Sequence, residues 1–371
     1  MGMGTDRSSL HSQLLADALA RQHRIGLDLD ATEIDGQRIA VRQSVVSQMP
    51  FCRLLHFERD ARRSDPRLIV VAPLSGHKAV LMRDTLAALL PDHDLFLMEW
   101  TDARDVPVAE GGFALEENIA YVIDFVRRLG GDVHLLGLCQ SCIPVLAGAA
   151  LLAATGDPAQ PRSLILISGA IDPRINPTRI GRLAAHRSID WLERHAITRV
   201  PPPHAGEGRR VYPASIQRTA LLSYLARHLA TGGELFWKVF HDDGADSASH
   251  PFIELFFSVM DLAAEFFLDN MRSVFHEYLL PRGALTWRGS PVDLRAIGQT
   301  ALMTVEGEFD DVSGVGQTRI AHALCSGIPS ALREHHLQKS VGHFGTFHGR
   351  AWRSDILPRI RQFIRKTASP A

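Results

Sequence analysis

The chain opens with alternating apolar and polar positions and then changes rhythm. Within residues 24–59, the alternation from Arg38 to Val46 and from Phe51 to Phe57 predicts antiparallel strands. From Leu68 onward, short runs that are apolar throughout alternate with helically spaced segments. Because strands covered on both faces have no polar side, this pattern predicts a parallel sheet between layers of helices. The expected strands are Leu68–Ala72, Leu95–Met98, Val133–Leu138, Ser163–Ser168, Ala301–Val305 and Leu332–Leu337, and the expected helices are Ala79–Leu90, Leu115–Leu129, Pro144–Ala154 and Ile356–Ile364.

The alternation of strand and helix patterns stops near Asp172 and resumes at Ala301, which predicts a mainly helical insertion into an α/β core. We expect an N-terminal segment over residues 1–23, a core formed by residues 24–171 and 296–371, and an inserted cap over residues 172–295. Within the cap, the spacing predicts one long helix over Phe252–Leu280. At about 100° per residue its polar side chains share roughly 80° of arc. The wide apolar remainder is typical of a subdomain core and also fits the roof of an apolar substrate site. The polar residues are Glu254, Asp261, Glu265, Asp269, Arg272 and His276.

A candidate nucleophile lies where the strand Val133–Leu138 meets the next helix. Gly137-Leu138-Cys139-Gln140-Ser141 has the strand–turn–helix context of a nucleophile elbow, with Cys139 at the nucleophile position and Ser141 where a second glycine is usual. A helix N-terminus and a neighbouring histidine both favour the thiolate, which attacks an ester or thioester carbonyl. The alternative is that Cys139 is a buried, unreactive cysteine, since cysteine is among the most buried residues.

The expected partners of this nucleophile follow it along the chain in the order of an α/β-hydrolase triad. A turn carrying four carboxylates, Glu306 to Asp311, comes after the strand Ala301–Val305, and His343 comes after the last strand between small neighbours. Asp311 fits the N-cap of a helix expected near Ser313, which favours Asp310 as the acid, with Asp311 as the alternative. A solvated acidic loop is the other interpretation of the turn.

The oxyanion of such a reaction needs two backbone N–H donors. One is expected from Gln140, the residue after the nucleophile. The other is expected from the loop Pro73-Leu74-Ser75-Gly76-His77, where Ser75 is the best-placed donor and Leu74 is the alternative. The sequence assigns His77 no role beyond packing at the start of the next helix.

Composition and charge exclude several other classes of protein. The 40 Lys+Arg against 41 Asp+Glu give a net charge of −1, which disfavours a nucleic-acid binder. Four cysteines in 371 residues do not form a disulfide framework, the N-terminus lacks the apolar run of a signal peptide, and no stretch is long and apolar enough to cross a membrane. We therefore expect a reduced, cytoplasmic enzyme. The metal, P-loop and dinucleotide motifs are missing, so no metal or cofactor is expected.

Eight segments of the chain together resemble the intracellular poly(3-hydroxybutyrate) depolymerases. They are Pro50–Phe57, Ala72–His77, Leu138–Gln140, Gly169–Asp172 with Asn176–Pro177, Met260–Phe266, Val305–Asp311, Gly314–Thr318 and Val341–Gly345, and the similarity spans roughly residues 24–365. The resemblance implies an α/β-hydrolase fold with a cap, a triad at Cys139, Asp310 and His343, and hydrolysis of the polyester or its oligomers. The family usually has proline at the position of Ser141, which bears on pocket shape. The shorter N-terminal segment bears on granule attachment and oligomeric state.

Two further functions stay open at this point. A polyhydroxyalkanoate synthase also uses cysteine on this fold, although such enzymes keep glycine where this chain has Ser141. A non-catalytic protein of the granule surface would keep the fold and use an apolar cap for binding. The expected partner is therefore a polyester or oligomeric hydroxyacid ester, met in the cytoplasm or at the granule surface. A homodimer stays open, and so does the question whether the cap is a moving lid or an oligomer interface.

Overall fold

A nine-stranded sheet forms the centre of the part of the chain that the computed structural model describes, which is residues 26–61, 63–233 and 255–368. The strand order is β1-β2-β3-β5-β4-β6-β7-β13-β14. The first four strands in this order pair antiparallel, and β5 through β14 pair parallel. The bounds are β1 Ala31–Ile34, β2 Gln37–Met49, β3 Cys52–Arg59, β4 Arg67–Val71, β5 Asp94–Trp100, β6 His134–Leu138, β7 Ser163–Ile167, β13 Ala301–Gly307 and β14 Arg333–Gln338.

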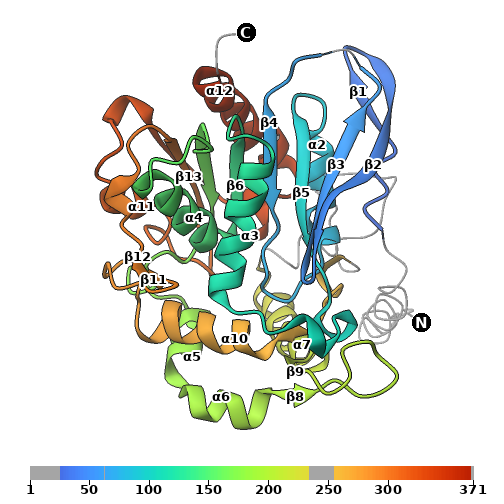
Figure 1. Ribbon diagram of the computed structural model, residues 1–371, viewed down its shortest axis with the longest axis vertical. Helices are drawn as coiled ribbons and strands as arrows, with labels where there is room; N and C mark the ends of the chain where they lie inside the picture. Colours follow the sequence, from blue (N-terminus) through green and yellow to red (C-terminus); the bar gives the residue numbers. More distant parts are fainter. Residues whose placement is uncertain (1–25, 62, 234–254, 369–371) are drawn as a thin grey trace, which may run out of the picture.

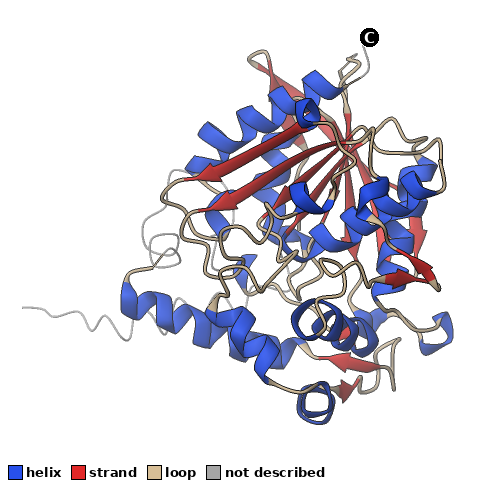
Figure 2. Ribbon diagram, turned by 90° about the vertical axis from the view of Figure 1, so that its left-hand side faces the viewer, coloured by secondary structure: helices blue, strands red, loops and turns tan. Residues whose placement is uncertain are grey.

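Helices cover both faces of this sheet (Figures 1 and 2). On one face α3 (Leu115–Arg128) packs against α4 (Cys142–Ala154). On the other, α2 (Arg83–Leu89) lies beside α12 (Leu357–Thr367), where Arg361 donates to the Ala88 carbonyl at 2.9 Å. The strands β6 and β7 are buried along their whole length, which explains why neither has a polar residue after its first position. The predicted parallel sheet between helical layers is confirmed.

The segment between β7 and β13 lies beyond one end of the sheet (Figure 1). It contains α5 (Arg179–His186), α6 (Ile189–Ala196), α7 (Ala214–Thr231) and α10 (Ala264–Asn270). A small antiparallel sheet joins β8 (Thr198–Arg199), β9 (Arg210–Tyr212) and β10 (Leu262–Ala263), and a hairpin joins β11 (Thr286–Trp287) to β12 (Ser290–Pro291). We call this segment the cap. No helix in the described ranges is long and apolar enough to span a membrane.

The single long helix expected over Phe252–Leu280 is wrong. Residues 252–254, including Glu254, lie outside the described residues, and from Ser258 to Met260 the chain is extended. Val259 forms an antiparallel bridge with His77, and Lys78 N–H donates to the Ser258 carbonyl at 2.8 Å. Leu255 and Phe256 are helical, the helix ends before Phe257, and the next helix begins at Ala264 and continues as a π-helix from Met271 to His276. Backbone pairing with the loop after β4 therefore overrides the helical periodicity.

The cap meets the core at the carboxyl ends of the strands. After β5, Asp102 accepts from the Asp261 backbone N–H at 3.1 Å, and Arg104 forms a two-bond ion pair with the Asp261 carboxylate. Asp261 also accepts from the Ala214 N–H at the start of α7, at 2.8 Å. These buried polar contacts fix the cap over the edge where sites form in open α/β sheets.

Candidate active site

Cys139 lies at a sharp turn between β6 and α4. Its φ is +54°, in the left-handed region that strains a residue with a side chain by about 1–3 kcal/mol. Strand and helix approach closely at Gly137, where an added Cβ would lie 3.2 Å from a Val145 methyl carbon and 3.3 Å from the Cys142 Cα. This is the geometry of a nucleophile elbow, in which the surrounding contacts hold one residue in a strained conformation.

Ser141 has a side chain where the elbow pattern has glycine, and the structure shows what the hydroxyl does. The Leu138 N–H donates to Oγ at 2.7 Å, and Oγ lies 2.8 Å from the Val71 carbonyl at the end of β4. The side chain is buried. Ser141 therefore joins the elbow to the neighbouring strand, and its hydroxyl is not presented to a substrate.

The four cysteines differ in exposure, and all are free thiols. Cys52, Cys142 and Cys325 are buried, and burial raises the pKa of each thiol, that of Cys325 to about 12. Cys142 contacts the carbonyls of Gly137 at 3.3 Å and Ile167 at 3.6 Å. Cys139 alone among them is partly exposed. Cys142 and Cys325 are therefore residues of the hydrophobic core.

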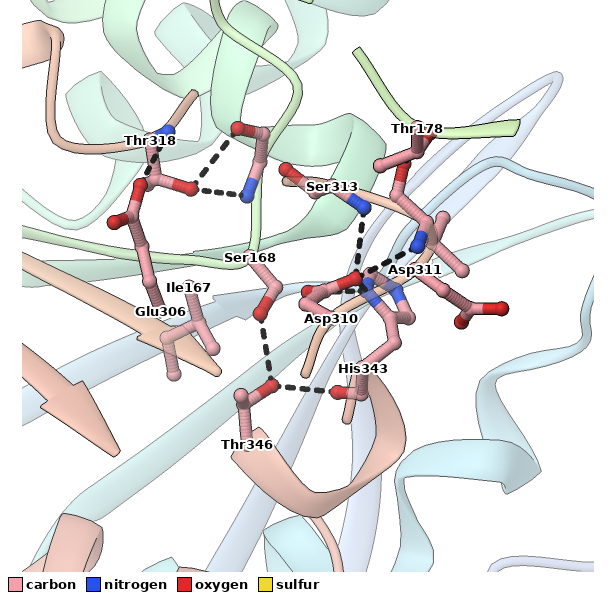
Figure 3. A network of polar contacts seen from close by, with 12 residues as sticks. Ile167, Ser168, Thr178, Glu306, Asp310, Asp311, Ser313, Thr318, His343 and Thr346 are labelled. Carbon is pink, nitrogen blue, oxygen red and sulfur yellow. Dashed lines mark hydrogen bonds and ion pairs between the residues drawn. The ribbon is translucent and has the colours of Figure 1, made fainter. Parts of the chain in front are cut away.

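Asp310 and His343 form a buried pair (Figure 3). His343 Nδ1 lies 2.9 Å from Oδ2 and 3.1 Å from Oδ1 of Asp310, and because an ionised carboxylate only accepts, Nδ1 carries the proton. Burial lowers the pKa of His343, but the charge of Asp310 and the interactions of the ring with Cys139 and Asp310 raise it by more, so the pKa lies well above its usual value. The structure thus brings Cys139, His343 and Asp310 together.

Asp310 and Asp311 have different partners, and the reason given above for choosing between them is wrong. No helix starts near Ser313; the chain turns there, and the next helix, α11 (Ala321–Leu324), begins later. Asp310 itself caps the turn, accepting from the backbone N–H groups of Val312 at 2.9 Å and Ser313 at 2.7 Å. The Asp310 carboxylate is therefore fixed by the turn while it holds His343.

Asp311 points away from His343 and toward α7 of the cap. It accepts from the Tyr224 hydroxyl at 2.6 Å, from Arg227 at 3.0 Å and from His228 Nε2 at 3.2 Å. Burial alone would raise the pKa of Asp311, but these hydrogen bonds and charges lower it. Asp311 connects the cap to the acid turn and has no contact with the imidazole of the pair.

A hydroxyl pair holds the backbone of His343 (Figure 3). Thr346 Oγ1 donates to the His343 carbonyl at 2.7 Å and lies 3.0 Å from Ser168 Oγ, which therefore donates to it. Ser168 follows β7, is fully buried and has a φ of +49°. Neighbouring contacts thus fix the histidine loop against the end of β7.

Glu306 supports the same edge of the sheet from inside. Its buried carboxylate accepts from the backbone N–H groups of Gly316, Thr318 and Arg319 at 2.8–3.0 Å. Thr318 Oγ1 in turn accepts from the Gly169 N–H at 2.8 Å (Figure 3). Of the four carboxylates expected on this turn, Glu306 is therefore a structural anchor.

The two expected oxyanion donors follow β6 and β4, which are neighbouring parallel strands of the sheet. Gln140 is in the first helical turn after β6, where backbone N–H groups lack helical acceptors. Ser75 is exposed and Leu74 buried, and within the described residues the N–H of neither has a hydrogen-bond partner. Gly76 has a φ of +110°, and a Cβ there would lie 1.6 Å from Gln217 Oε1 on α7. The cap therefore shapes the loop that carries Ser75.

His77 is the residue that sequence reasoning missed. Its ring lies 5.6 Å from that of Phe256, and its Nε2 is buried with no hydrogen-bond partner in the described part of the chain. Burial lowers the pKa of His77 to about 4; a bond to the Phe256 carbonyl opposes this, and His343 lowers it further. Its place directly after the expected oxyanion loop was the one sequence signal available.

No group of three or more His, Cys, Asp or Glu side chains within the described ranges could hold a metal ion. The polar groups around Cys139 instead form the set needed for acyl transfer: a thiol, an imidazole oriented by a carboxylate, and free backbone donors.

Comparisons with known proteins identify both fold and family. A membrane phospholipase A, described as a novel bacterial virulence factor, has a TM-score of 0.52 at 13% identity, covering 98% of this chain and 95% of that chain. A candidate aryl esterase from Burkholderia cenocepacia has a TM-score of 0.50 at 13% identity, covering 89% and 100%. At these identities the likeness shows the α/β-hydrolase fold. No curated protein matches the chain.

The family described as "PHB de-polymerase C-terminus" matches residues 168–368, more than half of the chain. The matched span includes Asp310 and His343 and begins after Cys139. The chain therefore belongs to the PHB de-polymerase C-terminus family and is a PHB depolymerase-like hydrolase with an α/β-hydrolase fold.

Proposed function

We propose that this protein hydrolyses poly(3-hydroxybutyrate) or its oligomers through a Cys139–His343–Asp310 triad and a thioester intermediate. The observation that carries the proposal is the buried pair of His343 and Asp310, in which the imidazole is also hydrogen-bonded to the Cys139 side chain. The strained backbone of Cys139 and membership of the depolymerase family support it.

In the acylation step, the Cys139 thiolate attacks the ester carbonyl carbon. The carbonyl oxygen becomes an oxyanion that the backbone N–H groups of Gln140 and Ser75 stabilise. The raised pKa of His343 favours the imidazolium, which donates its Nε2 proton to the departing alkoxide. The ester C–O bond breaks, an alcohol-ended chain leaves, and the acyl group remains on sulfur as a thioester.

In the deacylation step, the same histidine works in the opposite direction. Once sulfur is acylated, the negative charge that raised the pKa of His343 is gone, so the ring more readily stays neutral. Neutral Nε2 takes a proton from water, and the hydroxide attacks the thioester carbonyl. The C–S bond breaks, the hydroxy acid leaves and the thiolate–imidazolium pair is restored. Asp310 keeps Nδ1 protonated throughout.

An apolar roof over the triad supports a methyl-bearing polyester as substrate. The ring of Phe344 lies 5.5 Å from that of His343, and the Phe256 ring lies 5.5 Å from that of Phe344. Both phenylalanines are buried, and Phe256 comes from the cap. Apolar packing of this kind next to the imidazole favours an aliphatic ester over a charged one and excludes water that would compete during acylation. We further propose that the protein acts in the cytoplasm, at the surface of polymer granules, as the family resemblance implies.

The test is release of hydroxy acid from amorphous polymer and from a short oligomer. Wild type is compared with Cys139→Ala and with the matched control Cys142→Ala, each checked for folding by circular dichroism. The proposal predicts loss of hydrolysis only in Cys139→Ala. Equal hydrolysis in wild type and Cys139→Ala would refute it. Release of coenzyme A from a hydroxyacyl-CoA with growth of polymer would indicate a synthase instead, and polymer binding without turnover by reduced protein would indicate a binding protein.

A further inference from the structure

A buried polar atom beside the triad has no use in the chemistry described so far. His77 Nε2 is shielded from solvent and has no hydrogen-bond partner in the described residues. Leaving a buried acceptor or donor unpaired costs about 1–3 kcal/mol, so such atoms are usually satisfied by a ligand or water. His77 lies two residues after Ser75, on the loop proposed to hold the oxyanion.

The surroundings of His77 fix where this atom lies. The backbone of His77 pairs with Val259 of the cap, and the flanking Lys78 N–H donates to the Ser258 carbonyl at 2.8 Å. The ring contacts Phe256 and is close enough to His343 to be influenced by its charge. Phe256 in turn packs on Phe344, with ring centroids 5.5 Å apart, and Phe344 packs on His343 at 5.5 Å, so a continuous set of ring contacts joins His77 to the catalytic histidine.

The chemistry of Nε2 follows from the hydrogen bond that the ring already makes. Burial keeps the ring neutral, since its pKa is lowered to about 4, and a neutral imidazole has a single N–H. The ring bonds to the Phe256 backbone carbonyl, which accepts only, and Nε2 has no partner, so the N–H is at Nδ1. His77 Nε2 is therefore a hydrogen-bond acceptor without a donor among the described residues.

A polyester of hydroxy acids offers few donors. Its ester groups only accept hydrogen bonds, so an interior segment cannot satisfy Nε2, whereas a chain end has a free hydroxyl. In a terminal 3-hydroxyacyl unit this hydroxyl is on the carbon two positions from the carbonyl carbon, and His77 is two residues after Ser75, the expected oxyanion donor. Gln140 Oε1, next to Cys139, is a second buried oxygen without a partner in the described residues. Two buried polar atoms, one next to the nucleophile in the chain and one on the expected oxyanion loop, thus have no hydrogen-bond partner among the described residues.

We propose that His77 Nε2 accepts a hydrogen bond from the free 3-hydroxyl of the acyl unit bound at Cys139, so that the protein removes hydroxy-acid units from the hydroxyl end of a chain. This inference rests on the proposed function and adds the end of the polymer that is recognised. His77 is in this account a substrate-binding residue, and the triad carries out the chemistry.

The test is a cycle of two substrates and two proteins. The substrates are p-nitrophenyl 3-hydroxybutanoate and p-nitrophenyl butanoate, which share a leaving group and differ by the hydroxyl. The proteins are wild type and His77→Phe, whose ring can pack on Phe256 but cannot accept a hydrogen bond. Wild type is expected to favour the hydroxy ester about tenfold in kcat/KM, as for a hydrogen bond to a buried acceptor. In His77→Phe the preference is expected to fall to within about twofold of one, through slower turnover of the hydroxy ester alone.

Equal losses on both esters would overturn the inference and assign His77 to packing or to the attacking water. If His77→Phe does not fold, wild type is given polymer whose hydroxyl ends are acetylated. Slower release of acid than from uncapped polymer supports the inference, and equal release overturns it. Failure of the proposed function is a separate result. In that case the Cys139→Ala variant would cleave both esters as fast as wild type, or wild type would cleave neither ester.

Discussion

Replacing Asp310 by asparagine separates the two adjacent carboxylates of the acid turn. The asparagine Oδ1 can still accept from the Val312 and Ser313 N–H groups, so the turn is expected to fold. What changes is the group facing His343 Nδ1. An amide NH₂ donates, so it favours the tautomer with the proton on Nε2, and that nitrogen then cannot take a proton from the thiol or from water.

The size of the effect follows from the burial of the pair. Both side chains are almost completely buried and the carboxylate contacts Nδ1 through both oxygens, at 2.9 and 3.1 Å. Removing a charge at this distance should lower the pKa of His343 by about 1–3 units. Fixing the wrong tautomer should reduce kcat roughly 10³- to 10⁴-fold, as for the carboxylate of other catalytic triads. The thiol should also be alkylated more slowly near neutral pH, because its imidazolium partner is lost.

Asp311→Asn is the matched control. Its carboxylate contacts Tyr224, Arg227 and His228 on α7, and the side chain is partly exposed. Its loss should lower the free energy of unfolding by about 1 kcal/mol, since exposed ion pairs are screened, and leave kcat within about threefold. Both variants are assayed for ester turnover and for the pH dependence of iodoacetamide alkylation. Near-normal kcat in Asp310→Asn, or an equal loss in Asp311→Asn, would refute the assignment of Asp310.

Three other substitutions test the supports of the site. Ser141→Gly should lower the free energy of unfolding by about 1–3 kcal/mol in urea, because two hydrogen bonds of the elbow are lost, while activity stays sensitive to thiol alkylation; alkylation-resistant turnover would contradict this. Thr346→Val should lower kcat with little change in KM and Thr346→Ser should restore it, whereas unchanged kcat in the valine variant would show that the contact to the His343 carbonyl is dispensable. Burial and then Asp261 raise the pKa of Asp102 to about 6 from 3.8, so the folded state holds its proton longer than the unfolded state does, and this residue's contribution to stability is lost as pH rises from about 4 to about 6. Between these two pH values the free energy of unfolding of wild type should therefore fall by up to roughly 3 kcal/mol through Asp102, and Asp102→Asn should lack this fall. An unchanged pH dependence of the free energy of unfolding in the variant would contradict this.

The parallel part of the sheet could be predicted from the sequence because burial on both faces leaves a distinctive pattern. Strands such as β6 and β7 have no polar side, and their expected bounds agree with the structure to within a residue. The edge strand β1 was missed, although Asp35-Gly36 is a strong hairpin signal and both residues have positive φ. Its short polar sequence carries little of the alternation on which the prediction relied.

The cap and the details of the site depend on contacts between distant segments, which periodicity does not record. Ser258 to Met260 pair with the loop after β4, so a stretch with helical spacing became extended. Asp311 resembles an N-cap in sequence, but its partners are on α7. The contacts of His77 with Phe256 and Val259 depend on the pairing of the loop after β4 with the cap, and no local motif predicts them.

The most direct test of the central claim is to trap the acyl-enzyme. The protein is mixed with p-nitrophenyl 3-hydroxybutanoate, quenched in acid during turnover, digested and analysed by mass spectrometry. The account predicts a 3-hydroxybutyryl group on the peptide that contains Cys139, lost on treatment with neutral hydroxylamine and missing from Cys139→Ala. Turnover with the acyl group on another residue would contradict it, and so would turnover that continues unchanged when Cys139 is fully alkylated.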